Sequence, residues 1–194
     1  MHRSFDITSE PASEPLTLAQ AKNHLKIDTS ITEDDDLITA LIKIARQTAE
    51  KYCRRLLYTQ TQVMRLDYFY NLMEINRTPI QSISSIKYYD SDNTLQTLST
   101  DYYDVDVKSS PARITLKYGA TYPTIKERTN AIEITFVAGW QTVAAIPENI
   151  ISGMYLLIGH LYENRESVVI GKIVNELPMG VKYLWDLDRI YVFN

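Results

Sequence analysis

The sequence contains very little cysteine and no excess of positive charge. Cys53 is the only cysteine in 194 residues, so the chain cannot form an internal disulfide, which suits a reducing cytosol. The 24 acidic and 20 basic residues give a formal net charge of -4. This is the wrong sign for a surface that neutralises the phosphates of duplex DNA. Composition therefore argues against a disulfide-stapled scaffold and against a duplex DNA-binding protein.

Long hydrophobic runs are also absent. The most apolar segment, residues 149–162, is shorter than the roughly 20 residues that a helix needs to cross a bilayer. Residues 1–10 are mixed and polar, so we expect no signal peptide. We expect no membrane segment, and the chain is long enough to bury a substantial core.

Motifs of catalysis are missing as well. There is no Gly-x-Gly-x-x-Gly, phosphate-binding loop, nucleophile elbow, His-Glu-x-x-His or paired cysteine. His160 and Glu163 have a spacing that can hold a metal on one helix face, but the sequence offers no complete ligand set. We expect His160 to be a hydrogen-bonded interface residue instead, and we predict no enzyme, no metal and no other cofactor.

Two helices are predicted near the N-terminus. The first follows Thr17 and reaches about Lys26, because Thr17 and Gln20 have the spacing of a capping box. We expect Thr32 to cap the second helix and residues 33–36 to fall in its first turn, where carboxylates are favourable. The same acidic cluster lacks the glycine and the bidentate glutamate of a calcium-binding loop.

The second helix should extend for five or six turns. Its apolar stripe repeats at helical spacing from Leu37 to Leu56, and Lys51, Arg54 and Arg55 should lie in its last turn, where positive charge suits the helix dipole. Such a helix docks its apolar stripe on a neighbour.

Residues 60–137 change to an alternating pattern rich in β-branched and aromatic residues. Short antiparallel strands are expected here, with a turn at residues 90–93. Residues 118–129 have the composition of an exposed loop that could reach a partner.

The tyrosines of this region suggest two interpretations. Tyrosine faces can stack on single-stranded nucleic acid, but such platforms normally alternate with Lys and Arg. Here the neighbours are carboxylates: Asp90, Asp92, Asp101, Asp104 and Asp106. We therefore favour packing within the sheet, or contact with a protein, over stacked bases.

A strand–helix junction joins the two halves of the chain. Residues 132–140 alternate as a strand does, and Pro147 opens an apolar helix that ends near Tyr162. The predicted fold is α+β: a small helical bundle built from N-terminal helices (1–59) and C-terminal helices with a docking tail (140–194), with an inserted antiparallel β region (60–139).

The last part of the chain carries a turn and a short amphipathic segment. Pro178 and Gly180 mark the turn, and Tyr183 and Trp185 lie in the segment that follows. An aromatic, helix-prone tail is suited to docking on a partner. The alternative is that Trp185 closes the core of its own chain, and the sequence does not separate the two.

Several motifs occur in an order that resembles the head-tail connector (adaptor) family of tailed double-stranded DNA bacteriophages and prophages. The resemblance spans about residues 14–191. It is carried by Leu16-Thr17-Leu18-Ala19-Gln20-Ala21-Lys22-Asn23-His24-Leu25-Lys26, an acidic-start helix, Gln60-Thr61, Pro111-Ala112-Arg113, Ile134-Thr135-Phe136-Val137-Ala138-Gly139-Trp140, Ile146-Pro147, His160-Leu161-Tyr162-Glu163-Asn164-Arg165-Glu166 and Glu176-Leu177-Pro178-Met179-Gly180-Val181. Cys53-Arg54-Arg55 replaces the Thr-Gly common in the family after the second helix, and Met179 replaces a more usual aromatic residue.

The resemblance implies a structural protein of the virion neck, assembled in the bacterial host cytoplasm. Members form a ring of about twelve copies under the portal, which requires two different complementary surfaces on each subunit. The implied partners are other copies, the portal protein and the next neck or tail-completion protein, with DNA passing through the channel without specific binding. An acidic wall would suit this passage.

We expect contacts with the portal or a neighbouring subunit at two segments that flank residues 167–175. The expected residues are His160, Tyr162, Glu163, Asn164, Arg165, Glu166, Leu177, Pro178, Met179, Gly180, Tyr183 and Trp185. Two alternatives stay open: another neck or tail-completion protein, and a single-stranded nucleic-acid-binding module.

Overall fold

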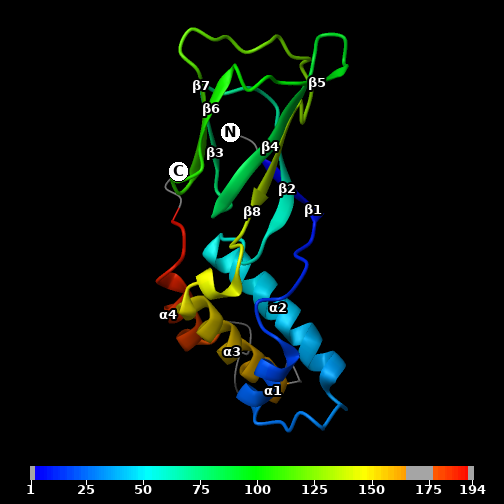
Figure 1. The fold of residues 1–194 in the computed structure, drawn as a ribbon, viewed down its shortest axis with the longest axis vertical. Helices are drawn as coiled ribbons and strands as arrows, with labels where there is room; N and C mark the ends of the chain where they lie inside the picture. Colours follow the sequence, from blue (N-terminus) through cyan, green and yellow to red (C-terminus); the bar gives the residue numbers. More distant parts are fainter. Residues whose placement is uncertain (1–2, 165–176, 192–194) are drawn as a thin grey trace, which may run out of the picture. The chain divides into compact units, whose positions relative to one another are not determined.

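The computed structural model describes residues 3–164 and 177–191. Contacts divide the chain into two compact units (Figure 1). The β unit comprises Met1–Ala12 and Tyr58–Trp140, and the helical unit comprises Ser13–Leu57 and Gln141–Asn194. Each unit is therefore assembled from two separate stretches of sequence.

The larger sheet of the β unit has five antiparallel strands in the order β1-β2-β8-β4-β5. Their bounds are β1 Ser4–Ser9, β2 Gln60–Leu66, β4 Ile80–Tyr89, β5 Leu95–Thr97 and β8 Ile132–Ala138. In the central strand β8, Ile132, Ile134, Phe136 and Ala138 are completely buried, while the residues between them are partly exposed. This period of two places one face of the sheet in the core.

The smaller sheet has three antiparallel strands in the order β3-β7-β6. Their bounds are β3 Leu72–Ile75, β6 Tyr103–Asp106 and β7 Ala112–Leu116. Met73, Ile75 and Ile114 are buried, and Figure 1 shows these strands beside the larger sheet. The predicted antiparallel β region is confirmed.

Two local features of the β unit follow from its sequence. At the predicted turn, the Asp90 carboxylate accepts hydrogen bonds from the amides of Asp92 and Thr94, while Asn93 adopts a φ of 62°. At the end of β8, Gly139 has a φ of +103°, and a Cβ there would lie 2.1 Å from the Tyr58 carbonyl oxygen. Only glycine permits this close approach.

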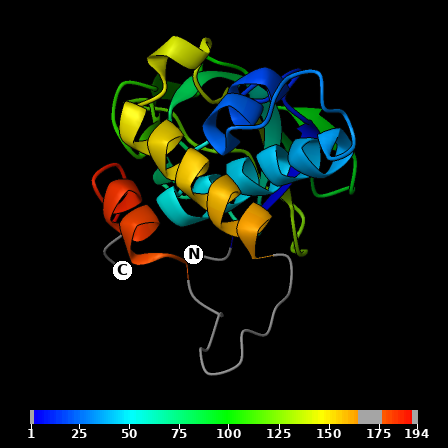
Figure 2. The ribbon, with the colours of Figure 1, turned by 90° about the horizontal axis from the view of Figure 1, so that it is seen from below.

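The helical unit packs its helices against one another (Figure 2). Their bounds are α1 Leu18–Leu25, α2 Asp35–Cys53, α3 Glu148–Glu163 and α4 Met179–Asp186, with a short 3-10 helix η1 at Val143–Ala145. The capping box of Thr17 and Gln20 is present at the start of α1. The predicted α+β fold, with N- and C-terminal helices and a β region between them, is confirmed.

The start of α2 and the path of residues 4–9 differ from expectation. The N-cap of α2 is Asp34, not Thr32. The buried Lys22 ammonium donates hydrogen bonds to the carbonyl oxygens of Thr29 and Ile31, so a tertiary contact fixes the segment that was expected to begin the helix. Residues 4–9, assigned to the helical N-terminal part, instead form β1 at the edge of the larger sheet.

A buried ionic cluster holds the helical unit together. The Arg46 side chain, 2% exposed, pairs with Glu14 at 2.7 Å and with Glu50 at 2.9 Å. Glu50 also accepts a hydrogen bond from the Leu57 amide at 2.9 Å. Because a buried charge is tolerated only when it is paired and hydrogen-bonded, this cluster connects the start of the unit with the end of α2.

Candidate functional site

Helix α4 is apolar on two opposite faces. Val181 and Trp185, four residues apart, are completely buried. Met179, Tyr183 and Leu187 follow one another at the same spacing but are exposed by 87%, 68% and 59%. A separation of two residues turns a helix by about 200°, so the exposed set lies opposite the buried one. We call Met179, Tyr183 and Leu187 the α4 stripe.

The buried face of α4 fixes the helix on α3. The Trp185 indole donates a hydrogen bond to the Ile150 carbonyl oxygen at 3.1 Å, beside Gly153. Trp185 thus has the second of the two roles that the sequence left open, since it fills the core of its own unit. Gly180 brings the start of α4 close to Leu156, a side chain of α3 that is 44% exposed and extends the apolar surface.

Polar contacts with the end of α2 fix the C-terminal end of α4 and the residues that follow it. The Tyr52 hydroxyl donates to Asp186 at 2.9 Å, and burial together with this carboxylate raises the pKa of Tyr52. The Arg55 side chain donates to the Asp188 carbonyl oxygen at 2.6 Å, and the Ile190 amide donates to that of Cys53 at 3.0 Å. The α4 stripe is therefore presented by a rigidly anchored helix.

The other predicted segment lies at the C-terminal end of α3. Tyr162 donates a hydrogen bond to Asp34 at the start of α2, and Asn164 donates to the His160 carbonyl oxygen at 2.8 Å. Glu163 is exposed. Arg165 and Glu166 lie outside the described residues.

The two predicted segments approach each other where α4 begins. Gly180 lies close to Leu156, which is one helical turn before His160, whereas Trp185 packs farther away, beside Gly153, ten residues or about 15 Å of helix before Glu163. Leu177 and Pro178 are partly exposed and precede α4. Leu156 and Leu187 were missed by the sequence analysis, although Leu187 continues the four-residue spacing from Met179 through Tyr183.

Among the described residues, no group of three or more His, Cys, Asp or Glu side chains is placed to hold a metal ion. No helix in residues 3–164 or 177–191 is long and apolar enough to span a membrane. The feature that stands out is an exposed apolar surface, and such surfaces commonly mark protein contacts.

Comparisons with solved structures find the same fold. A chain from the neck of an empty GTA (gene transfer agent) particle, computed with C6 symmetry, is 19% identical with a TM-score of 0.79, and the match covers 98% of this chain and 97% of that chain. A chain from the virion of a native gene transfer agent particle is 18% identical with a TM-score of 0.78, and the match covers 97% of both chains. A chain from the neck of a native GTA particle computed with C12 symmetry is 18% identical with a TM-score of 0.75, and the match covers 98% of this chain and 97% of that chain.

Comparison with curated protein sequences gives no significant match. The sequence profile of the family described as "Phage gp6-like head-tail connector protein" matches residues 15–118, which is more than half of the chain. That span contains α1, α2 and most of the β unit. The chain therefore belongs to the phage gp6-like head-tail connector family, and its role is that of a structural head-tail connector.

Proposed function

We propose that this connector assembles with other copies of itself into a ring of about twelve subunits below the portal, where it extends the DNA channel and carries the next neck or tail-completion protein. The observation that supports this best is the match over 98% of the chain to a protein of the GTA neck. A second neighbour comes from a neck computed with C12 symmetry, the symmetry of a closed ring of twelve. The ring belongs to the virion and assembles in the host cytoplasm.

The charge of the chain fits a channel through which DNA slides. The formal net charge is -4, and the exposed residues Asp92, Asp101 and Asp104 add negative potential around the β5–β6 region. A wall that repels phosphates does not hold the DNA by counterion release. DNA passes through without specific binding.

The α4 stripe is the surface that docks on the portal. It offers three large apolar side chains on one helix face, and an apolar helix face docks in a groove of a partner. The anchoring of α4 removes much of the entropic cost of ordering that accompanies docking. His160, Tyr162, Glu163 and Asn164, with Arg165 and Glu166, provide a second contact with the portal or a neighbouring subunit.

The test is binding to the cognate portal protein. A variant with Met179→Ser, Tyr183→Ser and Leu187→Ser should bind portal at least roughly tenfold more weakly, because exposed anchor residues at an interface each contribute about 1 kcal/mol or more. Its thermal unfolding should match the wild type, since the stripe is not part of the core. Negative-stain electron microscopy of the wild type with portal should show an added disc.

The matched control changes three exposed apolar residues of the β unit. Ile7→Ser, Leu72→Ser and Leu95→Ser each replace an apolar side chain of the β unit, exposed by 51%, 46% and 42%. This variant should bind portal like the wild type. Equal binding by the α4 variant would contradict the docking assignment, whereas a wild type that forms no ring and ignores portal would contradict the connector ring itself.

The nearest alternative is a different place in the neck, as a tail-completion protein that binds another partner. Binding assays with the purified portal protein and with the purified tail-completion protein, run side by side, distinguish this alternative from the proposed connector. A single-stranded nucleic-acid module is separated by oligonucleotide binding that falls steeply with salt.

A further inference from the structure

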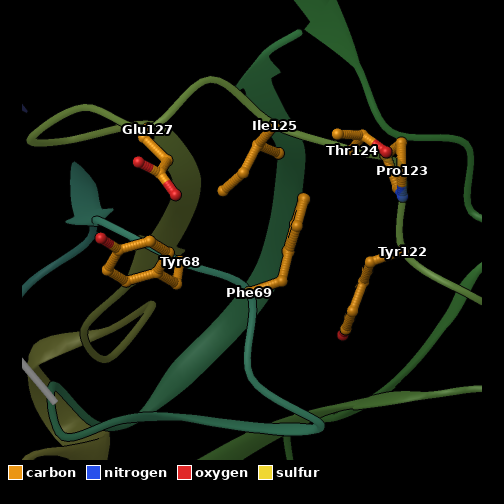
Figure 3. Close-up of a pocket in the computed structure, with 7 residues that line it drawn as sticks. All are labelled: Tyr68, Phe69, Tyr122, Pro123, Thr124, Ile125 and Glu127. Atoms are coloured by element: carbon orange, nitrogen blue, oxygen red, sulfur yellow. The ribbon is translucent and has the colours of Figure 1, made fainter. Parts of the chain in front are cut away.

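The β unit contains an apolar pocket of about 370 Å³ that none of the contacts above uses (Figure 3). Its walls come from Tyr68 and Phe69, which follow β2, and from residues 122–125 and 127, which precede β8. Figure 3 shows the Glu127 carboxylate beside the Tyr68 ring, with Ile125 above the space between Tyr68 and Phe69. Most of the lining is therefore aromatic or aliphatic, with one acidic group.

The pocket is built on fixed backbone. The Phe69 and Tyr122 rings stack in parallel with centroids 4.3 Å apart. The Lys126 amide donates to the Tyr89 carbonyl oxygen at 3.0 Å, and the Arg128 guanidinium lies 3.9 Å from the Tyr89 ring centroid. These contacts hold the irregular segment against β4, so the pocket is present before any ligand arrives.

Glu127 gives the pocket a chemical preference. Its side chain is exposed, and within residues 3–164 and 177–191 its carboxylate has no hydrogen bond or ion pair. An aromatic face beside an unpaired carboxylate suits a cationic side chain, whose charge meets the carboxylate while its aliphatic stem packs on the ring. The pocket therefore selects a Lys or Arg accompanied by an apolar residue.

The outward face of α2 carries this combination. From Thr39 to Lys51 its exposed residues include Lys43, Ile44 and Lys51, and no exposed carboxylate lies between them, because Glu50 is buried. Ile44 is 44% exposed, and the Lys43 and Lys51 ammonium groups have no ion pair within the described part of the chain. This face matches the pocket in both charge and apolar character.

We propose that the pocket of one subunit receives the Lys43–Ile44 face of α2 from a second copy of this chain, with Lys43 paired to Glu127. The contact joins two different surfaces, as a closed ring requires of its subunits. It rests on the proposed ring and names the surfaces through which neighbouring copies meet.

Charge reversal tests the pairing. Glu127→Lys and Lys43→Glu, each alone, should weaken self-association roughly tenfold in sedimentation velocity and in electron microscopy of rings, with or without portal. An equimolar mixture of the two single variants should restore assembly. In a ring where the two variants alternate, the lysine introduced in one pocket meets the glutamate introduced on the neighbouring helix. At the next contact, an unchanged Glu127 meets an unchanged Lys43.

The control is a mismatched pair. Glu33→Lys reverses another exposed carboxylate and should assemble like the wild type. In a mixture with Lys43→Glu it should not restore assembly of the Lys43→Glu chains, because its Glu127 would meet the introduced glutamate. Unchanged rings in Glu127→Lys, or a mixture that fails to recover, would overturn the pairing while leaving the connector ring in place. Loss of portal binding without loss of self-association in Glu127→Lys would also overturn it, because the occupant would then be the portal. A wild type that never forms rings would instead contradict the proposed function.

Discussion

The indole nitrogen of Trp185 occupies the position that a side chain on Gly153 would need. A Cβ built on Gly153 would lie 2.2 Å from Trp185 Nε1, whereas one on Gly159, in the same helix, would have its nearest neighbour, His24 Nε2, at 3.6 Å. The two glycines of α3 therefore have different physical reasons to be there. Only the first is required by packing.

Alanine at these two glycines should have opposite effects on stability. Gly153→Ala displaces the buried indole and should lower the free energy of unfolding by about 1–3 kcal/mol, as overpacking does. Gly159→Ala finds ordinary contact distance and should raise it by about 0.5–1 kcal/mol, because alanine favours the helix interior. Urea denaturation followed by tryptophan fluorescence measures both. Equal effects would show that α4 does not seat Trp185 against α3.

Arg46 and Arg65 each pair with two carboxylates, but they should contribute differently to the stability of the fold. Arg46→Met leaves the Glu50 carboxylate buried without its partner, so we expect a loss of about 3–5 kcal/mol in the free energy of unfolding. Arg65→Met is the matched control: Arg65 pairs with Asp6 and Glu133, but its side chain is 26% exposed. It should cost no more than about 1 kcal/mol. Comparable losses would mean that burial is not what makes the Arg46 cluster important.

The single thiol should report on opening of the helical unit. Cys53 is completely buried, and burial raises the pKa of its thiol to about 12. The thiolate is the reactive form, so the folded protein should resist thiol reagents at pH 8 and react at once in denaturant. Rapid labelling under native conditions, measured by mass spectrometry, would contradict this arrangement. Stability should also fall as pH rises from the ordinary thiol pKa toward 12, because only the unfolded chain then loses the proton.

An acidic titration should reveal the ion pair on the outer face of the smaller sheet. Arg113 lies 2.8 Å from Asp106 and, with the Ser109 and Lys108 amides, lowers the pKa of this carboxyl to about 2. The folded pKa is below the unfolded one, so the stabilising effect is present above the ordinary aspartate pKa and is lost as pH falls toward 2. In Arg113→Gln the pKa of Asp106, measured by NMR, should rise toward its ordinary value. If the pKa of Asp106 did not rise, the backbone amides alone would account for its low value.

Local patterns in the sequence predicted the elements that are stabilised by residues close to them in the sequence. The alternation of residues 132–138 gives a central strand because both of its edges meet regular neighbours, and the Thr17–Gln20 capping box needs only four residues. Strand β1 was missed because its evidence is distant. Phe5 pairs with Met64 and packs edge-to-face on Phe136, with ring centroids 6.4 Å apart.

The candidate site was predictable as a segment but not as a surface. Trp185, Tyr183 and Met179 look alike in an amphipathic tail, and only the packing beside Gly153 decides which of them is buried. Only one wall of the pocket at Glu127 lies in a segment that the sequence marks, the loop of residues 118–129. The other wall, Tyr68 and Phe69, is more than fifty residues away and meets the first only through sheet pairing.

The place of β8 in the larger sheet has a consequence for biosynthesis. This strand lies between β2 and β4, yet the ribosome makes it after both. Until residue 138 has emerged, the β1–β2 pair and the β4–β5 pair have no strand to join them, and each presents an open edge. The nascent chain can therefore complete this sheet only after β8 has emerged and paired with both β2 and β4. Chaperone protection of this chain should matter most before β8 has emerged, while β2 and β4 lack the strand that lies between them.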